Sequence, residues 1–147
     1  WPVIIVGAGN LGQALAGYGG FIDRGFPVGG IVDVDPAKFD VVVAGARVRP
    51  LDELSQIVES KDISIGVVAV PSSAAQDAAD LLVKAGVTSI LNFAPVILSV
   101  PVGITVRKVD LAVELQILSY HEQRRSVAQQ NGQLQGAPAD RGRGATA

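Results

Sequence analysis

A run of four aliphatic residues, Val3 to Val6, leads directly into the glycine-rich segment from Gly7 to Gly12. The run contains no polar residue, which is typical of a parallel strand that is buried on both faces. The segment reads Gly-Ala-Gly-Asn-Leu-Gly, and apolar residues at helical spacing follow it. A strand that turns through closely spaced glycines into a helix brings main-chain amides against a phosphate group. This feature therefore constrains both the first β-α unit and the edge of the sheet where a ligand would bind.

Each glycine has its own physical role in this pattern. Gly7 allows the tight turn out of the strand, Gly9 lacks the Cβ atom that would hold a pyrophosphate away, and Gly12 lets the helix pack close to the sheet. Asp33 ends the next apolar run, about 20 residues further on. Its carboxylate can accept hydrogen bonds from the adenosine ribose and would repel a 2′-phosphate, and Val34 beside it supplies no cation. The pattern predicts NADH/NAD+ rather than the phosphorylated cofactor; a glycine turn followed by an Asp that caps a turn is the alternative.

Strand and helix patterns alternate along the chain. Further strands are predicted at Val28 to Asp33, Val41 to Val43, Val48, Ile63 to Val70, Ser89 to Phe93 and Ile104 to Val106. Helices are predicted at Leu11 to Tyr18, at Leu51 to Val58, and from Ser72 as a cap to Gly86 as a terminator, with a short helix or turn capped by Asp35. This rhythm of βαβ units predicts an α/β fold with a doubly wound, Rossmann-like parallel sheet. Right-handed crossovers then place the loops that follow the strands along one edge.

Two more loops at this edge are candidates for contact with the cofactor. The loop that begins at Pro71 can line the adenine or pyrophosphate side, or it can simply end a strand and cap a helix. In the loop after the next strand, Phe93 and the main chain are candidate walls for the nicotinamide half, with Phe93 as an ordinary core residue left open. The predicted cofactor-binding residues are Gly7, Ala8, Gly9, Asn10, Leu11, Gly12, Asp33, Val70, Pro71, Asn92, Phe93, Ala94 and Pro95.

Composition excludes several classes of site. The chain has no cysteine and one histidine, which excludes a disulfide framework, thiolate catalysis and a multi-His metal cluster. The formal net charge of −2 is not a nucleic-acid-binding balance, and Gly and Pro interrupt every apolar stretch short of the ~20 residues of a membrane span. Neither Tyr18 nor Tyr120 has a lysine four residues on, and His121 lies among charged residues. We therefore expect no metal, no membrane segment and no catalytic residue, hence a sensor rather than an enzyme.

The end of the chain departs from this rhythm. Residues 110–125 are predicted to form a last helix whose apolar surface is too wide for one side of a sheet, which suggests burial on two sides, a partner chain being one candidate. Its apolar positions are Leu111, Val113, Leu115, Ile117, Leu118 and Tyr120. Residues 126–147 are rich in Gln, Gly, Ala and Arg and are predicted to be a disordered tail. We therefore divide the chain into a dinucleotide domain (1–109), a dimerisation helix (110–125) and the tail (126–147). Because no methionine occurs and a strand begins almost at once, we interpret the chain as lacking an N-terminal part.

The sequence resembles the Rex family of redox-sensing transcriptional repressors over residues 3–125. The resemblance rests on Val6 to Gly12, Asp33 to Pro36, Val70-Pro71 with Ala74-Ala75-Gln76, Leu91 to Val96, Val100-Pro101 and Val109 to Leu111. The first stretch occurs in all dinucleotide folds. Leu-Asn-Phe-Ala-Pro-Val followed by Val-Asp and a leucine-rich helix is far more specific.

The resemblance implies a homodimer whose terminal helix is exchanged between subunits, with operator DNA bound only through an N-terminal winged-helix domain absent from this chain. It also implies tighter binding of NADH than of NAD+, release from the operator on NADH binding, and a cytoplasmic location. Leu111 is expected to enter the partner's nicotinamide pocket or to be an ordinary interface leucine. Asp110 is expected to cap the swapped helix and to meet Tyr18 across the dimer. Leu115 and Leu118 belong to the same interface.

Two other functions remain open on the sequence. The chain could be the cofactor domain of an NAD-dependent dehydrogenase or reductase whose substrate lobe is missing. It could also be a ligand-gated module of a transporter or channel. Residues upstream of Trp1 would separate the three interpretations, as a basic winged helix, another lobe or an apolar span.

Overall fold

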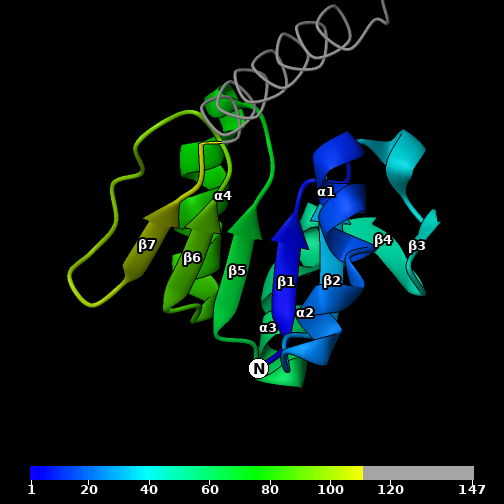
Figure 1. Cartoon of the computed structure of the whole chain (residues 1–147). Coiled ribbons are helices and arrows are strands. Elements are labelled where there is room, and N and C mark those ends of the chain that lie inside the picture. The colour runs from blue at the N-terminus through cyan, green and yellow to red at the C-terminus, as the bar shows by residue number, and fades with distance from the viewer. Residues whose placement is uncertain (111–147) are drawn as a thin grey trace, which may run out of the picture. The chain divides into compact units, whose positions relative to one another are not determined.

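The computed structural model describes residues 1–110, in which long β-branched runs form one sheet with helices on both faces (Figure 1). The strands are β1 (Val3–Val6), β2 (Val28–Asp33), β3 (Val42–Val43), β4 (Ala46–Pro50), β5 (Ile65–Val68), β6 (Ser89–Asn92) and β7 (Thr105–Lys108). The helices are α1 (Asn10–Ala16), α2 (Gly19–Asp23), α3 (Leu54–Lys61) and α4 (Ser72–Ala85), with short 3₁₀ turns η1 (Pro36–Lys38) and η2 (Leu51–Glu53).

The sheet has the strand order β3-β4-β2-β1-β5-β6-β7. All pairings are parallel except that of β3 with β4, which form an antiparallel hairpin at one edge. The chain runs outward from β1 through β2 to β4, then crosses back to β5 and runs outward the other way. The predicted doubly wound α/β fold is thus confirmed, and its reversal point lies between β1 and β5. In open α/β sheets a ligand binds at this point, outside the carboxyl ends of the strands.

Alternating side chains give the sheet two separate cores. Ile4 and Val6 of β1 point to the face covered by α3 and α4, where Leu54 and Leu82 are fully buried. On the other face Ile5 packs with residues of α1 and of the neighbouring strands. Figure 1 shows α1 and α2 in front of β1 and β2, and α4 behind β5 and β6. Each sheet face therefore carries its own helices, as right-handed crossovers require.

Several predicted helix ends are confirmed and one is wrong. Asp35 caps η1, with its Oδ1 accepting a hydrogen bond from the Ala37 amide at 3.0 Å. Gly86 ends α4 in the left-handed conformation at φ 107°. Ser72 does not cap α4, because it is already the first helical residue and Pro71 occupies the cap position. The fixed backbone of proline suits an extended cap residue, so the helix starts without a capping hydroxyl.

Helix α2 was not predicted from the sequence. Helix α1 ends at Ala16 rather than at Tyr18, and Tyr18 becomes the extended cap residue of α2. The Tyr18 and Phe21 rings meet edge to face with centroids 5.0 Å apart, a local contact that helps hold a helix of only five residues. The predicted strand over residues 63–70 is also shorter, since β5 covers only Ile65–Val68.

The predicted helix 110–125, the predicted tail 126–147 and the expectations for Leu111, Leu115, Leu118 and His121 lie outside the described residues, except that Asp110 ends the described part. Within residues 1–110 no helix combines the length and apolarity that crossing a membrane requires. The same residues hold no group of three or more side chains suited to bind a metal ion.

Leu82 lies where α4 comes closest to the sheet, because a Cβ added to Gly66 of β5 would meet the Leu82 side chain at 2.8 Å. We expect Leu82→Ala to lower the free energy of unfolding by about 2–5 kcal/mol, as buried leucines do. The neighbouring Leu81 is 37% exposed, so Leu81→Ala is expected to cost less than about 1 kcal/mol. Urea unfolding followed by circular dichroism measures both values. Similar losses for the two variants would contradict this packing.

Candidate functional site

The loops that follow β1, β2, β5 and β6 meet at the carboxyl edge of the sheet. Main-chain hydrogen bonds join them beyond the regular strand pairing. The Gly7 amide donates to the Val32 carbonyl at 2.8 Å, and the Ala69 amide donates to the Val6 carbonyl at 2.8 Å. The sequence therefore brings the predicted cofactor-binding loops to one place, at the reversal point of the sheet.

The glycine turn after β1 is shaped by contacts that only glycine tolerates. Gly7 has φ +112°, and a Cβ there would lie 2.3 Å from the Ala69 carbonyl oxygen. A Cβ at Gly12 would lie 1.7 Å from the Gly7 carbonyl oxygen. The roles predicted for these two glycines, a tight turn and close helix packing, are confirmed. Gly9 differs, since no described atom lies within 4 Å of its Cβ position, so the turn leaves open space above it.

Helix α1 starts at this open space. Gly9 is its cap residue, and the Gln13 amide donates to the Gly9 carbonyl at 2.9 Å as the first bond of the helix. No side chain of the described residues caps this helix start. The first-turn amides, together with the positive end of the helix dipole, form the kind of site that holds a phosphate group. Of the predicted contacts, Ala8 is buried, Leu11 is half-buried and Asn10 is exposed.

Asp33 is tied to the glycine turn by its side chain. Its Oδ2 accepts a hydrogen bond from the Ala8 amide at 2.7 Å, and its Oδ1 accepts one from the Asp35 amide at 2.8 Å. Each carboxylate oxygen keeps a second lone pair, so these bonds leave capacity for ribose hydroxyls. Val34 next to it is 70% exposed and carries no charge. The carboxylate thus stands beside the turn in a fixed orientation.

Arg49 was missed by the sequence reasoning. It lies on β4 opposite Val32 of β2, and Pro50 after it is opposite Asp33. Its guanidinium forms a bidentate pair with Glu53, at 2.7 and 2.9 Å, and a further bond to Asp40 at 2.7 Å. The hydrogen bonds with Glu53 raise the pKa of Arg49 and lower the pKa of Glu53. Two carboxylates thus neutralise this cation.

The loop after β5 contacts the glycine turn directly. Val70 is half-buried, and its Cγ1 lies 3.0 Å from the position a Cβ on Gly7 would take. Pro71 is exposed and begins α4. Val70 therefore lies next to the turn, and Pro71 follows it at the start of α4.

The loop after β6 is organised by Asn92, the one fully buried polar side chain among the described residues. Its Nδ2 donates to the Val96 carbonyl at 2.8 Å, and its Oδ1 accepts from the Ala94 amide at 2.9 Å. Ala94 is buried, Phe93 is half-buried in the core on the α1 side, and Pro95 is exposed. Asn92 therefore holds the conformation of this loop. Because its side chain is buried, it would affect the binding of a ligand only by positioning the main chain of the loop.

Gln76 of α4 holds the same connection further along. Its Nε2 donates to the Ser99 carbonyl at 2.8 Å, and its Oε1 accepts from the Ser99 amide at 2.9 Å. The side-chain amide of Gln76 thus both donates to and accepts from the main chain of Ser99, as a residue of a neighbouring strand would. The sequence reasoning gave Gln76 only as part of a family motif.

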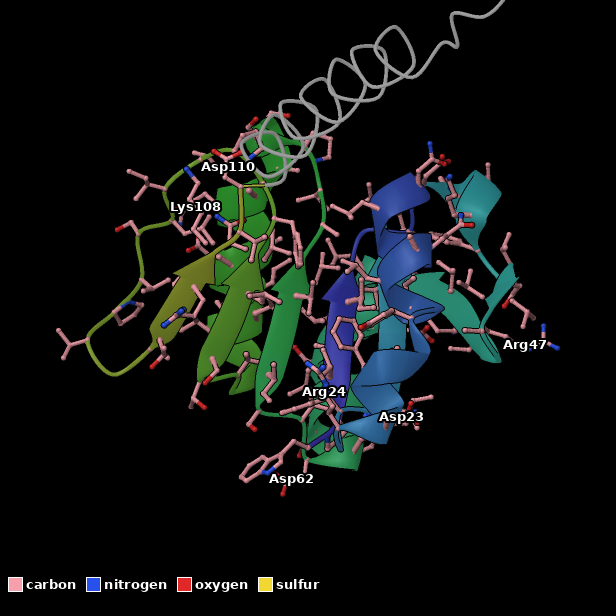
Figure 2. All side chains as sticks on the ribbon, viewed as in Figure 1. Asp23, Arg24, Arg47, Asp62, Lys108 and Asp110 are labelled. Carbon is pink, nitrogen blue, oxygen red and sulfur yellow. The ribbon has the colours of Figure 1, made fainter. Side chains whose placement is uncertain are left out.

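The two predicted switch residues in the described part lie on separate elements. Tyr18 is 53% exposed at the start of α2, and Asp110 follows β7. Figure 2 shows Asp110 and Lys108 at the carboxyl edge, with Asp62 at the opposite edge. Their predicted contact involves a second chain and stays a prediction.

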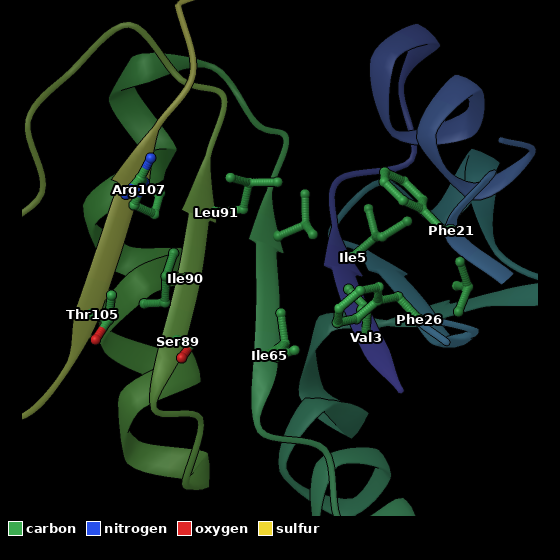
Figure 3. A pocket seen from close by; sticks show the side chains of 12 residues that line it. Val3, Ile5, Phe21, Phe26, Ile65, Ser89, Ile90, Leu91, Thr105 and Arg107 are labelled. Carbon is green, nitrogen blue, oxygen red and sulfur yellow. The ribbon is translucent and has the colours of Figure 1, made fainter. Parts of the chain in front are cut away.

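A separate apolar cavity lies on the sheet face that carries α1 and α2. It has a volume of about 300 Å³ and lies over β1, β5 and β6 (Figure 3). Ile5, Phe26, Ile65 and Leu91 line it, with Arg107 at its β7 side. None of the glycine-turn residues lines it, so it is distinct from the carboxyl-edge site.

Residues 1–96 match the protein family described as CoA binding domain. The chain belongs to this family. A redox-sensing transcriptional repressor Rex from Streptomyces avermitilis is 60% identical over 126 residues, which cover 86% of this chain and 50% of the repressor. The resemblance to the Rex family is thereby confirmed. The chain spans about half the length of the curated relatives it matches.

Solved structures agree with the sequence matches. The crystal structure of RSP in complex with β-NADH, from the Rex family, has a TM-score of 0.77 at 35% identity and covers 88% of this chain and 63% of that one. The structure of RSP with β-NAD+ and operator DNA has a TM-score of 0.76 at 34% identity and covers 95% of this chain and 63% of that one. The curated Rex relatives are named as redox-sensing transcriptional repressors.

The two glycines Gly12 and Gly9 allow a direct test of the turn. Gly12→Ala would drive a Cβ against the Gly7 carbonyl oxygen, so we expect a loss of about 3 kcal/mol in the free energy of unfolding, or failure to fold. The matched change Gly9→Ala enters open space and is expected to cost less than about 1 kcal/mol. Chemical denaturation of both variants gives the comparison. Equal stability of the two would show that α1 does not approach the turn so closely.

Proposed function

We propose that the chain is the NADH/NAD+-sensing domain of a transcriptional repressor. The observation that carries this proposal is the glycine turn tied to Asp33 at the reversal point of the sheet, in a chain that is 60% identical over 126 residues to one Rex repressor. NADH binding would release the intact dimer from operator DNA, which a winged-helix domain outside these 147 residues would bind. The domain would act in the cytoplasm as a regulator without catalytic residues of its own.

The residues of the turn fit the diphosphate of the cofactor. The first-turn amides of α1 would bind the phosphate oxygens, and the open space over Gly9 would admit them, since a Cβ there would project into that space. The carboxylate of Asp33, which the Ala8 amide already orients, would accept hydrogen bonds from the hydroxyls of the adenosine ribose. The bound cofactor would supply the redox signal, because its nicotinamide ring is cationic in NAD+ and neutral in NADH.

The charges around Asp33 favour NADH over NADPH. A 2′-phosphate would meet the Asp33 carboxylate at close range, and Val34 offers no cation to offset it. Arg49, on the neighbouring strand β4, is already paired with Glu53 and Asp40. The carboxylate of Asp33 therefore acts against the phosphorylated cofactor.

Discrimination between NADH and NAD+ would arise at the nicotinamide end. The ring of NAD+ is positively charged and that of NADH is neutral, so an apolar enclosure penalises NAD+ by desolvation. The loop from Asn92 to Pro95 would form one wall, and Leu111 of a partner chain would close the pocket. NADH can shift the dimer from an operator-binding arrangement to a released one only if it binds the released arrangement more tightly.

A homodimer through residues 110–125 would complete this site. Leu111, Leu115 and Leu118 would lie in the interface as part of a helix exchanged between subunits, and residues 126–147 would lie outside it. Asp110 of one chain would contact Tyr18 of the other. The support is the width of the apolar surface that this segment presents in a helix, which exceeds what one sheet can cover.

Calorimetric titration of the chain with NADH, NAD+ and NADPH tests the ligand. We expect NADH to bind most tightly and NADPH at least about tenfold more weakly, because like charges meet at Asp33. Asp33→Ala should narrow the gap between NADH and NADPH, whereas Asp77→Ala, at an exposed position of α4, should leave it unchanged. Comparable binding of NADPH by the unaltered chain would refute the role of Asp33. Binding of coenzyme A in place of all three would refute the proposed function.

Sedimentation velocity tests the dimer. We expect the chain to sediment as a dimer and the double variant Leu115→Arg/Leu118→Arg as a monomer, because each substitution would bury an unpaired charge in the interface. Leu134→Arg, in the predicted tail, serves as the matched control and should remain dimeric. A dimer that survives the double substitution would place the interface elsewhere.

A further inference from the structure

We propose that Gln13 is a positioning residue for the diphosphate of the cofactor, an inference that rests on the proposed function. The Ala8 main chain is held at both of its polar atoms. Its amide donates to Oδ2 of Asp33 at 2.7 Å, and its carbonyl accepts from Nε2 of Gln13 at 2.9 Å. Ala8 is fully buried, and Gln13 is half-buried on the second turn of α1.

The bond from Gln13 determines where the Gly9 amide points. The Ala8 carbonyl and the Gly9 N–H belong to the same trans peptide, in which the two groups point in opposite directions. Because Nε2 of Gln13 holds the carbonyl on its own side, the Gly9 N–H must point away from Gln13. No described atom lies within 4 Å of the position of a Gly9 Cβ. The side chain of Gln13 thus keeps this amide in one orientation beside open space.

Loss of the Gln13 donor would remove a constraint rather than a contact with the ligand. The Ala8 carbonyl would then have to find another partner in a buried position, and unpaired buried carbonyls are unfavourable. Rotation of the Ala8–Gly9 peptide would satisfy it, and that rotation would carry the Gly9 N–H away from the diphosphate. Asp33 holds only the other end of Ala8 and would not prevent the rotation.

This role predicts a specific pattern of binding. The diphosphate is the same in NADH, NAD+ and ADP-ribose, so a residue that positions its donors affects all three ligands by the same factor. A residue at the nicotinamide end would instead change the NADH/NAD+ ratio. Equal loss across the three ligands therefore separates a role at the glycine turn from one at the redox-sensing end.

The test compares the 147-residue chain with Gln13→Met, which keeps the side-chain length and loses the donor. We expect the dissociation constants for NADH, NAD+ and ADP-ribose each to rise about fivefold, the effect of one hydrogen bond, with the NADH/NAD+ ratio unchanged. Gln56→Met, at an exposed glutamine of α3, is the matched control and should leave all three constants unchanged. Gln13→Ala, which retains high helix propensity, provides a second variant and should show the same equal loss.

The outcomes separate this inference from the proposed function. Absence of binding by the unaltered chain would refute the proposed function itself. Normal binding by the unaltered chain and by both Gln13 variants would refute only the role of Gln13. A change in the NADH/NAD+ ratio would also refute it, since the effect would then lie at the nicotinamide end. Thermal unfolding of the free proteins identifies any variant whose loss of binding follows from loss of the fold.

Discussion

The approach of main chain to main chain at the end of β1 is the constraint on which the site depends. Gly12 brings the start of α1 against the Gly7 carbonyl, and Gly7 lies against the carbonyl of Ala69 after β5. No side chain separates these segments. The reversal point of the sheet is therefore lined by main chain, and the side chains of Asp33 and Gln13 hold the peptide groups on either side of Ala8. A ligand with several acceptor oxygens close together, such as a diphosphate, fits this lining best.

Around this backbone lining, side chains act mainly by holding one another or the main chain. Asp33 and Gln13 hold Ala8, Asn92 holds the loop after β6, and Arg49 is held by two carboxylates. Groups already engaged in the free protein need not be ordered again when a ligand binds, which reduces the entropic cost of binding. The same engagement limits which ligands are accepted, because a tied cation such as Arg49 offers little to an additional phosphate.

The sequence predicted those features that require a particular residue type at one position or a regular spacing of apolar residues. The glycine turn, the strand rhythm, the Asp35 cap and the Gly86 terminator belong to this group. Ser72 was misjudged because a capping hydroxyl and a first-turn serine look alike when proline precedes them. The ring contact in α2 and the hydrogen bonds of Gln13 and Arg49 join residues close together in the sequence, but each depends on the exact path of the backbone between its partners, which hydrophobic periodicity does not show.

The described residues concentrate the candidate contacts on the half of the cofactor that does not change with its redox state. Ribose and diphosphate are identical in NADH and NAD+, so the proposed contacts at Gly9 and Asp33 would contribute equally to the binding of both. Any preference must come from the nicotinamide ring, which is cationic in NAD+ and neutral in NADH. In such a domain, changes at the glycine turn would alter the affinity for NADH and NAD+ equally. Changes at the loop after β6 would alter the ratio of the two affinities and leave diphosphate binding at the turn intact. In the proposed dimer this separation allows the partner chain to influence discrimination while the turn keeps the cofactor bound.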